Sequence, residues 1–160
     1  MGQAMGRKPR QRARESAALF IFEITDWAPS YHFSVNGLPD RDSAYSEITL
    51  VEVDAVCRYP EKKLSGRTAH FSIYGDRGLL EPAQWRRTPD WRPSHVAHLE
   101  LPPSGGRCYA RLPIDSVGRL MAGFAHKRFR YVSLLGVELK RGRSLCTSIS
   151  FSTDEGLEDG

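Results

Sequence analysis

The chain has 160 residues, a length at which one domain buries a continuous core without disulfide or metal cross-links. Its hydrophobic fraction of 40% and charged fraction of 26% exclude a globally disordered protein. The formal charge of +4 excludes a strongly basic or acidic body, because much of the charge lies at the two ends of the chain.

The two ends carry charges of opposite sign. Residues 154–160 hold four acids and no base, whereas residues 1–14 hold no acid and five bases: Arg7, Lys8, Arg10, Arg12 and Arg14. Neither end has an apolar periodicity that would order it. We therefore expect a basic, disordered N-terminal tail over residues 1–16, a single domain over residues 17–153 and an acidic, disordered C-terminal tail over residues 154–160.

Cysteine usage and hydropathy favour a cytoplasmic protein. The three cysteines, Cys57, Cys108 and Cys146, are far apart and odd in number, so they predict buried packing rather than a disulfide framework. The longest apolar run, residues 17–22, is much shorter than the roughly 20 residues that cross a membrane. No stretch resembles a secretory signal, and we expect no membrane contact.

Alternating apolar and polar residues predict strands through the first half of the chain. Residues 19–24 and 30–35 alternate cleanly, and Ala28–Pro29 predicts a break between them. Residues 47–59 form a longer alternating run that ends before Pro60. A polar turn then leads to a strand over 68–73, so these last two strands are expected to form a hairpin.

The second half predicts four more strands and one helix. Residues 75–94 have no sustained period and indicate a long surface excursion. Strands follow at 96–101 and 107–112, and a final hairpin at 129–139 and 144–151. Between these pairs, apolar residues at helical spacing predict an amphipathic helix near 114–125.

These elements predict a mainly β fold. About eight strands with regular turns and one short helix fit a two-layer antiparallel β-sandwich, our preferred architecture, or an irregular barrel. The order of the strands does not follow from the sequence.

The excursion contains the strongest candidate for a binding site. Two tryptophans and three arginines lie close together in it: Trp85, Arg86, Arg87, Trp91 and Arg92. Trp and Arg are enriched among the residues that dominate protein interfaces, and they also stack on bases and neutralise phosphates in single-stranded nucleic-acid sites. The alternative is that the tryptophans cap an open end of the fold.

Candidates for chemistry are weak. No nucleophile elbow and no phosphate-binding loop is present. His95 and His98 point to opposite faces if their segment is a strand, so they join a metal site only if the segment is irregular and His70 converges on them. Glu52 and Asp54 share one strand face, which the alternation assigns to solvent. We expect no catalytic residues, no metal and no cofactor.

Two function classes follow. The leading prediction is a non-enzymatic binding or structural module that associates with a protein partner, or with copies of itself, through the Trp85–Arg92 segment or an exposed sheet edge. The alternative is a nucleic-acid-binding protein, in which the basic residues 7–14 attract phosphates and Trp85 or Trp91 stacks on bases.

Overall fold

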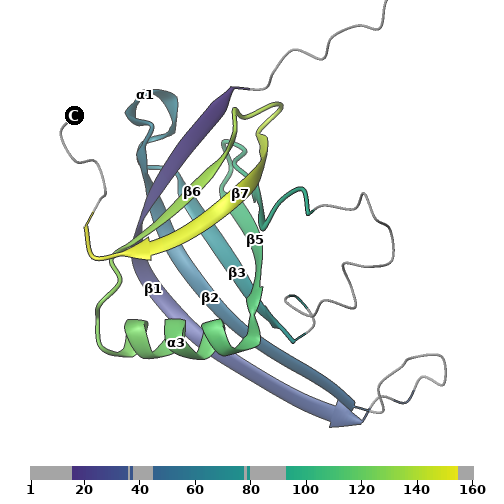
Figure 1. Cartoon of the computed structure of the whole chain (residues 1–160). Coiled ribbons are helices and arrows are strands. Elements are labelled where there is room, and N and C mark those ends of the chain that lie inside the picture. The colour runs from purple at the N-terminus through teal and green to yellow at the C-terminus, as the bar shows by residue number, and fades with distance from the viewer. Residues whose placement is uncertain (1–15, 36, 38–44, 78, 80–92, 155–160) are drawn as a thin grey trace, which may run out of the picture.

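The computed structural model describes residues 16–35, 37, 45–77, 79 and 93–154. Strands account for most of the regular structure in this part of the chain, which confirms the mainly β class (Figure 1). The elements are β1 (Ala17–Val35), β2 (Tyr45–Tyr59), α1 (Glu61–Leu64), β3 (Thr68–Asp76), β4 (Ala97–Glu100), β5 (Gly106–Pro113), α3 (Ile114–Ala125), β6 (Tyr131–Val137) and β7 (Arg143–Ser152).

The described strands close into a barrel in the order β1-β2-β3-β5-β4-β7-β6, with β6 returning to β1. Of the two architectures that the sequence predicts, the barrel is the one present. Neighbouring strands are antiparallel except β3 and β5, which run parallel. The two predicted hairpins, β2–β3 and β6–β7, are confirmed as antiparallel pairs. β4 and β5 are paired antiparallel as well.

The core lies inside the barrel, where alternate residues of each strand meet. Phe22 of β1 and Phe71 of β3 are fully buried, and their rings contact edge to face with centroids 5.1 Å apart. Burial of such apolar area is the main stabilising term of a domain of this size. The three cysteines belong to this core as free thiols, as predicted.

Helix α3 covers one end of the barrel, as its amphipathic sequence predicts (Figure 1). Its apolar stripe, which includes Val117, Leu120 and Phe124, is buried. The ring of Phe124 stacks on Trp27 of β1 at 5.2 Å and meets Phe129 edge to face at 5.8 Å. This aromatic cluster closes the core at the helix end.

The predicted break at Ala28–Pro29 is wrong, because β1 runs through it as one strand. Proline is tolerated in a strand whose N–H side has no partner. The pairing of β1 with β6 ends at Glu23, so Pro29 lies where β1 has no described neighbour on that side. The irregularities of β1 lie earlier, as register shifts at Ile21/Phe22 and Ile24/Asp26.

Strands β1 and β2 are longer than the barrel wall to which they belong. β6 pairs with β1 over Ala17–Glu23, and β3 pairs with β2 over Thr49–Val56. Beyond these limits β1 and β2 continue to pair with each other as far as Val35 and Tyr45. This ribbon, residues 30–35 and 45–48, projects past α3 and is called the arm (Figure 1).

The two glycines of α3 differ in what surrounds them. A methyl group on Gly123 would lie 2.0 Å from the Phe129 ring, whereas one on Gly118 would meet nothing within 4 Å. We expect Gly118→Ala to raise the free energy of unfolding by about 0.5–1 kcal/mol, because alanine loses less conformational entropy in a helix.

Gly123→Ala is the matched variant, and its effect has the opposite sign. The displaced Phe129 ring would disturb the aromatic cluster, so we expect a loss of about 1–3 kcal/mol. Urea unfolding of both variants checks the prediction. Equal effects at the two positions would contradict the packing of Phe129 against α3.

Candidate functional site

Most of the residues that the sequence singles out lie outside the described part of the chain. Residues 80–92 contain all five Trp and Arg candidates: Trp85, Arg86, Arg87, Trp91 and Arg92. The basic residues 7–14 likewise fall outside it. Both sets therefore remain predictions, and the described residues supply two other candidate surfaces.

The first surface is a face of the arm. Residues directly opposite in an antiparallel pair point to the same side, and the pairs here are Phe33 with Glu47 and Val35 with Tyr45. Because side chains alternate along β2, Tyr45 and Glu47 point to the same side as the buried Val51. This side of the arm thus continues the inner face of the barrel.

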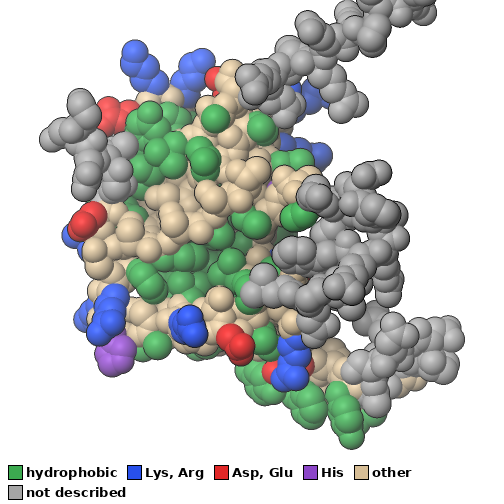
Figure 2. All heavy atoms as spheres, in the orientation of Figure 1, with side chains coloured by type: hydrophobic (Ala, Val, Ile, Leu, Met, Phe, Trp, Pro, Cys, Tyr) green, Lys and Arg blue, Asp and Glu red, His purple; other side chains and the backbone are tan. Residues whose placement is uncertain are grey.

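Beyond the aromatic cluster, no described residue covers this inner face. Tyr31, Phe33, Val35 and Tyr45, together called the arm face, are 64%, 55%, 75% and 58% exposed. The rings of Phe33 and Tyr45 stack on each other with centroids 5.5 Å apart. Figure 2 shows hydrophobic side chains gathered where the arm projects at the lower right. Contiguous exposed apolar groups of this kind mark interaction surfaces.

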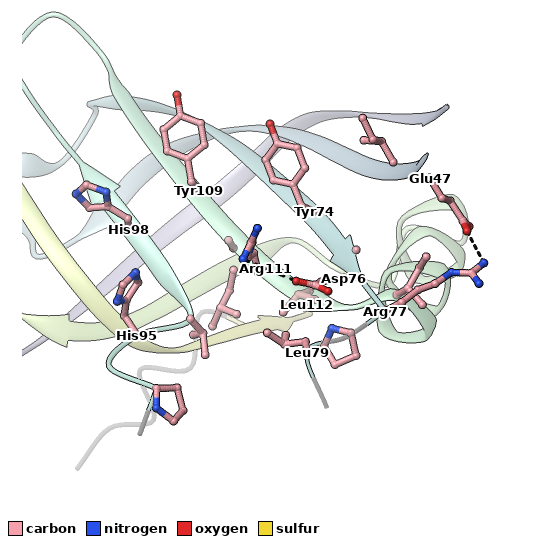
Figure 3. Close-up of a pocket in the computed structure, with 18 of the residues that line it drawn as sticks. Glu47, Tyr74, Asp76, Arg77, Leu79, His95, His98, Tyr109, Arg111 and Leu112 are labelled. Carbon is pink, nitrogen blue, oxygen red and sulfur yellow. Dashed lines mark ion pairs between the residues drawn. The ribbon is translucent and has the colours of Figure 1, made fainter. Parts of the chain in front are cut away.

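Glu47 is the one acidic residue among the arm residues 30–35 and 45–48, and an ion pair neutralises its carboxylate. Glu47 lies opposite Phe33 on the arm, and its carboxylate forms an ion pair with Arg77 at the end of β3 (Figure 3). The Glu47 side chain is only 18% exposed, while that of Arg77 is 70% exposed. The arm face therefore carries no bare acidic group that would oppose burial by a partner.

The second surface lies on the outer wall of the barrel. Cys108 and Ala110 of β5 are buried, so Arg107, Tyr109 and Arg111 point outward. Tyr74 of β3 is the neighbour of Arg111 in the strand register. We call these four outward residues, Tyr74, Arg107, Tyr109 and Arg111, the Tyr/Arg face.

Figure 3 shows the Tyr74 and Tyr109 rings projecting in the same direction from adjacent strands. His98 of β4 is the neighbour of Tyr109 on its other side. Tyr74 and Tyr109 line a groove of about 1690 Å³ that extends to the arm, where Phe33 and Tyr45 line it as well. The groove joins the two candidate surfaces.

A polar cluster, formed by His70, Asp54 and Glu52, adjoins the Tyr/Arg face. The Nδ1 atom of His70 lies 2.7 Å from Asp54 Oδ1, and its Nε2 atom lies 3.5 Å from Glu52 Oε1. The hydrogen bond to Asp54 raises the pKa of His70 above its ordinary value. The two carboxylates, which the sequence assigns to bulk solvent, thus share a histidine.

The histidines do not assemble a metal site among the described residues. His70 contacts β2 carboxylates, His95 bonds to Ser94, and the Nε2 atom of His98 lies 3.9 Å from Glu100. No group of three or more metal-ligating side chains forms in the described ranges. The sequence-level possibility that His70, His95 and His98 converge is therefore not realised here.

The buried thiols are not activated. Burial raises the pKa of Cys57 to about 11 and raises the pKa values of Cys108 and Cys146 as well. Thiols with raised pKa values remain protonated and are poor nucleophiles. This agrees with the packing role predicted for all three cysteines.

No protein-family model, no curated protein and no solved structure matches this chain. Within the described residues, neither helix has the length and apolar character that a bilayer-crossing segment needs.

The His70 cluster predicts a pH-dependent contribution to stability. Because the folded pKa of His70 lies above the unfolded value of about 6.5, the stabilisation is complete below that value and is lost as pH rises through the folded pKa. We expect His70→Gln to lower the free energy of unfolding by about 0.5 kcal/mol at mildly acidic pH, since the groups are partly exposed.

The same variant should have almost no effect at alkaline pH. Urea unfolding of the native chain and of His70→Gln across the pH range checks this, with His32→Gln, which forms no ion pair with a described residue, as the control. A His70→Gln effect that grew with pH would show that the sign is wrong.

Proposed function

We propose that this protein is a non-enzymatic binding module that self-associates, with the arm face of one copy packing against the arm face of a second copy. The observation that carries the proposal is the exposure of Tyr31, Phe33, Val35 and Tyr45 on one side of a two-stranded ribbon. A two-fold arrangement covers both faces with a single self-complementary contact.

The face, rather than the edge, of the arm is the contact we propose. The N–H of Ile24 still donates to the carbonyl oxygen of Arg130. Beyond Ile24, β1 pairs with β2 alone among the described strands, so its other edge is open there. Pro29 lies in this open stretch and has no N–H to donate to an added strand. Proline on an edge is a common protection against strand addition, so packing through side chains is favoured.

The available area sets the strength of the association. Large aromatic side chains offer about 150–250 Å² each, so the exposed fractions on two copies amount to about 900 Å² in total. Stable, specific interfaces bury about 1,200–2,000 Å², and smaller ones are transient. The arm face by itself therefore supports a weak, concentration-dependent dimer.

The alternative function, nucleic-acid binding, has a different basis. Its sequence-predicted residues, Arg7 to Arg14 and the two tryptophans Trp85 and Trp91, lie outside the described ranges. What favours it within those ranges is the Tyr/Arg face, which combines two exposed tyrosine rings with two outward arginines.

The self-association proposal predicts that a charge on the arm face separates the copies. We expect Phe33→Asp to raise the dimer dissociation constant at least about tenfold, because a buried, unpaired carboxylate opposes association by more than 1.4 kcal/mol. Sedimentation equilibrium over a range of concentrations gives the constant. Leu145→Asp, at a 43% exposed position on β7, is the control and should not change it.

A native chain that stays monomeric at every concentration, or a Phe33→Asp variant that dimerises like the native chain, would contradict the proposal. Circular dichroism of the variant separates loss of association from loss of fold. The exposed position of Phe33 makes misfolding an unexpected result.

The Trp85–Arg92 segment is tested independently of the arm. The sequence prediction that this segment supports association requires that Trp85→Ala with Trp91→Ala weakens the dimer, because truncating a hot-spot tryptophan costs 2 kcal/mol or more, about 30-fold in affinity. Size-exclusion chromatography with light scattering provides the measurement. An unchanged dimer would remove this segment from the interface and leave the arm face as the contact.

A further inference from the structure

The outer face of β5 repeats a cation, an aromatic ring and a cation at every second residue. Arg107, Tyr109 and Arg111 are the outward residues, and Tyr109 is 44% exposed. Alternation along the strand places all three on the same surface. The side chains between them, Cys108 and Ala110, fix this orientation because both are buried in the core.

A second ring stands beside this strand. Tyr74, 37% exposed on β3, pairs in register with Arg111, so it lies diagonally from Tyr109, one strand away and two residues along. Strand spacing and rise place the two Cα atoms about 8 Å apart. Among the described rings, neither tyrosine has a stacking partner. Both rings are therefore open to a planar ligand.

The cations of the face are accessible. Arg107 forms no ion pair with a described residue, and Arg111 has a 72% exposed side chain whose Nη1 atom lies 3.8 Å from Asp76. A separation of 3.8 Å on the surface is a weak interaction that an incoming anion can replace. Both guanidinium groups can thus donate hydrogen bonds to phosphate oxygens.

The acids around the face have partners of their own. Glu100 lies 3.6 Å from Arg143 and 3.9 Å from His98, and the carboxylates of Glu52 and Asp54 share His70. These contacts reduce the repulsion that a polyanion would meet beside Tyr109. The charge balance is nevertheless modest, so ring stacking rather than charge has to supply most of the affinity.

We propose that the Tyr/Arg face binds single-stranded nucleic acid, with adjacent bases on Tyr109 and Tyr74 and phosphates at Arg107 and Arg111. The alternation of cation and ring matches the alternation of phosphate and base along a single strand. Duplex bases are stacked on each other and offer no free ring face to the tyrosines. This site uses none of the arm-face residues and does not depend on self-association.

Fluorescence anisotropy of the full chain with a labelled oligothymidylate tests the site. We expect Tyr109→Ala to weaken binding at least about fivefold at a given salt concentration, because an alanine loses one stacking contact. Tyr109→Phe keeps the ring and should bind like the native chain. Tyr31→Ala, which removes an exposed ring from the arm instead, is the matched control and should leave oligonucleotide binding unchanged.

Salt dependence distinguishes this face from the basic residues 7–14. We expect Arg107→Gln to reduce the slope of log affinity against log salt by about 0.7, the value for one phosphate contact on a single strand. Tyr109→Ala should leave that slope unchanged while lowering the affinity. Circular dichroism and thermal melts of each variant show that the barrel is intact.

Three results would overturn the proposal. The first is that the native chain fails to bind the oligonucleotide at low salt. The second is that the Tyr74→Ala, Tyr109→Ala double variant binds the oligonucleotide as tightly as the native chain. In the third, a proline-rich peptide binds in a Tyr109-dependent way while the oligonucleotide does not, which would assign the face to a peptide ligand. The second result would leave the self-association proposal unaffected, because self-association is proposed to use the arm face alone.

Discussion

Strand β1 pairs with two neighbours over very different lengths, and the other features of the fold follow from this mismatch. With β6 it pairs over residues 17–23, which closes the barrel, and with β2 it pairs as far as Val35. Closure of the barrel gives the backbone N–H and C=O groups of the wall strands hydrogen-bond partners and encloses the core. The Trp27–Phe124 stack seals that core at the helix end. The arm, residues 30–35 and 45–48, lies beyond this stack and packs against no described core. Its apolar side chains are therefore exposed.

The sequence predicts the elements of this fold better than their relationships. Period-two alternation identifies the strands, and helical spacing identifies α3, because burial of one face is a local property of the chain. Strand length relative to the barrel is a global property, so the alternation of Tyr31, Phe33 and Val35 resembles an ordinary core strand. The register between β2 and β3 is likewise non-local, and it alone places His70 between Asp54 and Glu52. The predicted strand break at Pro29 is wrong because the effect of proline depends on which side of the strand is paired, and the local sequence does not show this.

The candidate sites show the same division between local and non-local information. The outward series Arg107, Tyr109 and Arg111 is visible in the sequence once β5 is known to be a strand, but two tryptophans in a nearby segment give a stronger local signal. The proximity of Tyr74 to Tyr109 requires the parallel pairing of β3 with β5, which no short-range pattern indicates. Phe33 and Tyr45 of the arm face line the same groove as Tyr74, Tyr109 and Arg111 of the Tyr/Arg face, so the two candidate surfaces adjoin each other.

An isotope-filtered nuclear Overhauser experiment observes contact between the arm faces of two copies directly. In a mixture of labelled and unlabelled chains at high concentration, we expect cross-peaks between the Phe33 and Tyr45 rings of different copies. These cross-peaks should fade on dilution, as the small area requires. Ring signals with contacts only inside one copy, at every concentration at which the protein stays soluble, would show that the arm faces do not pack against each other.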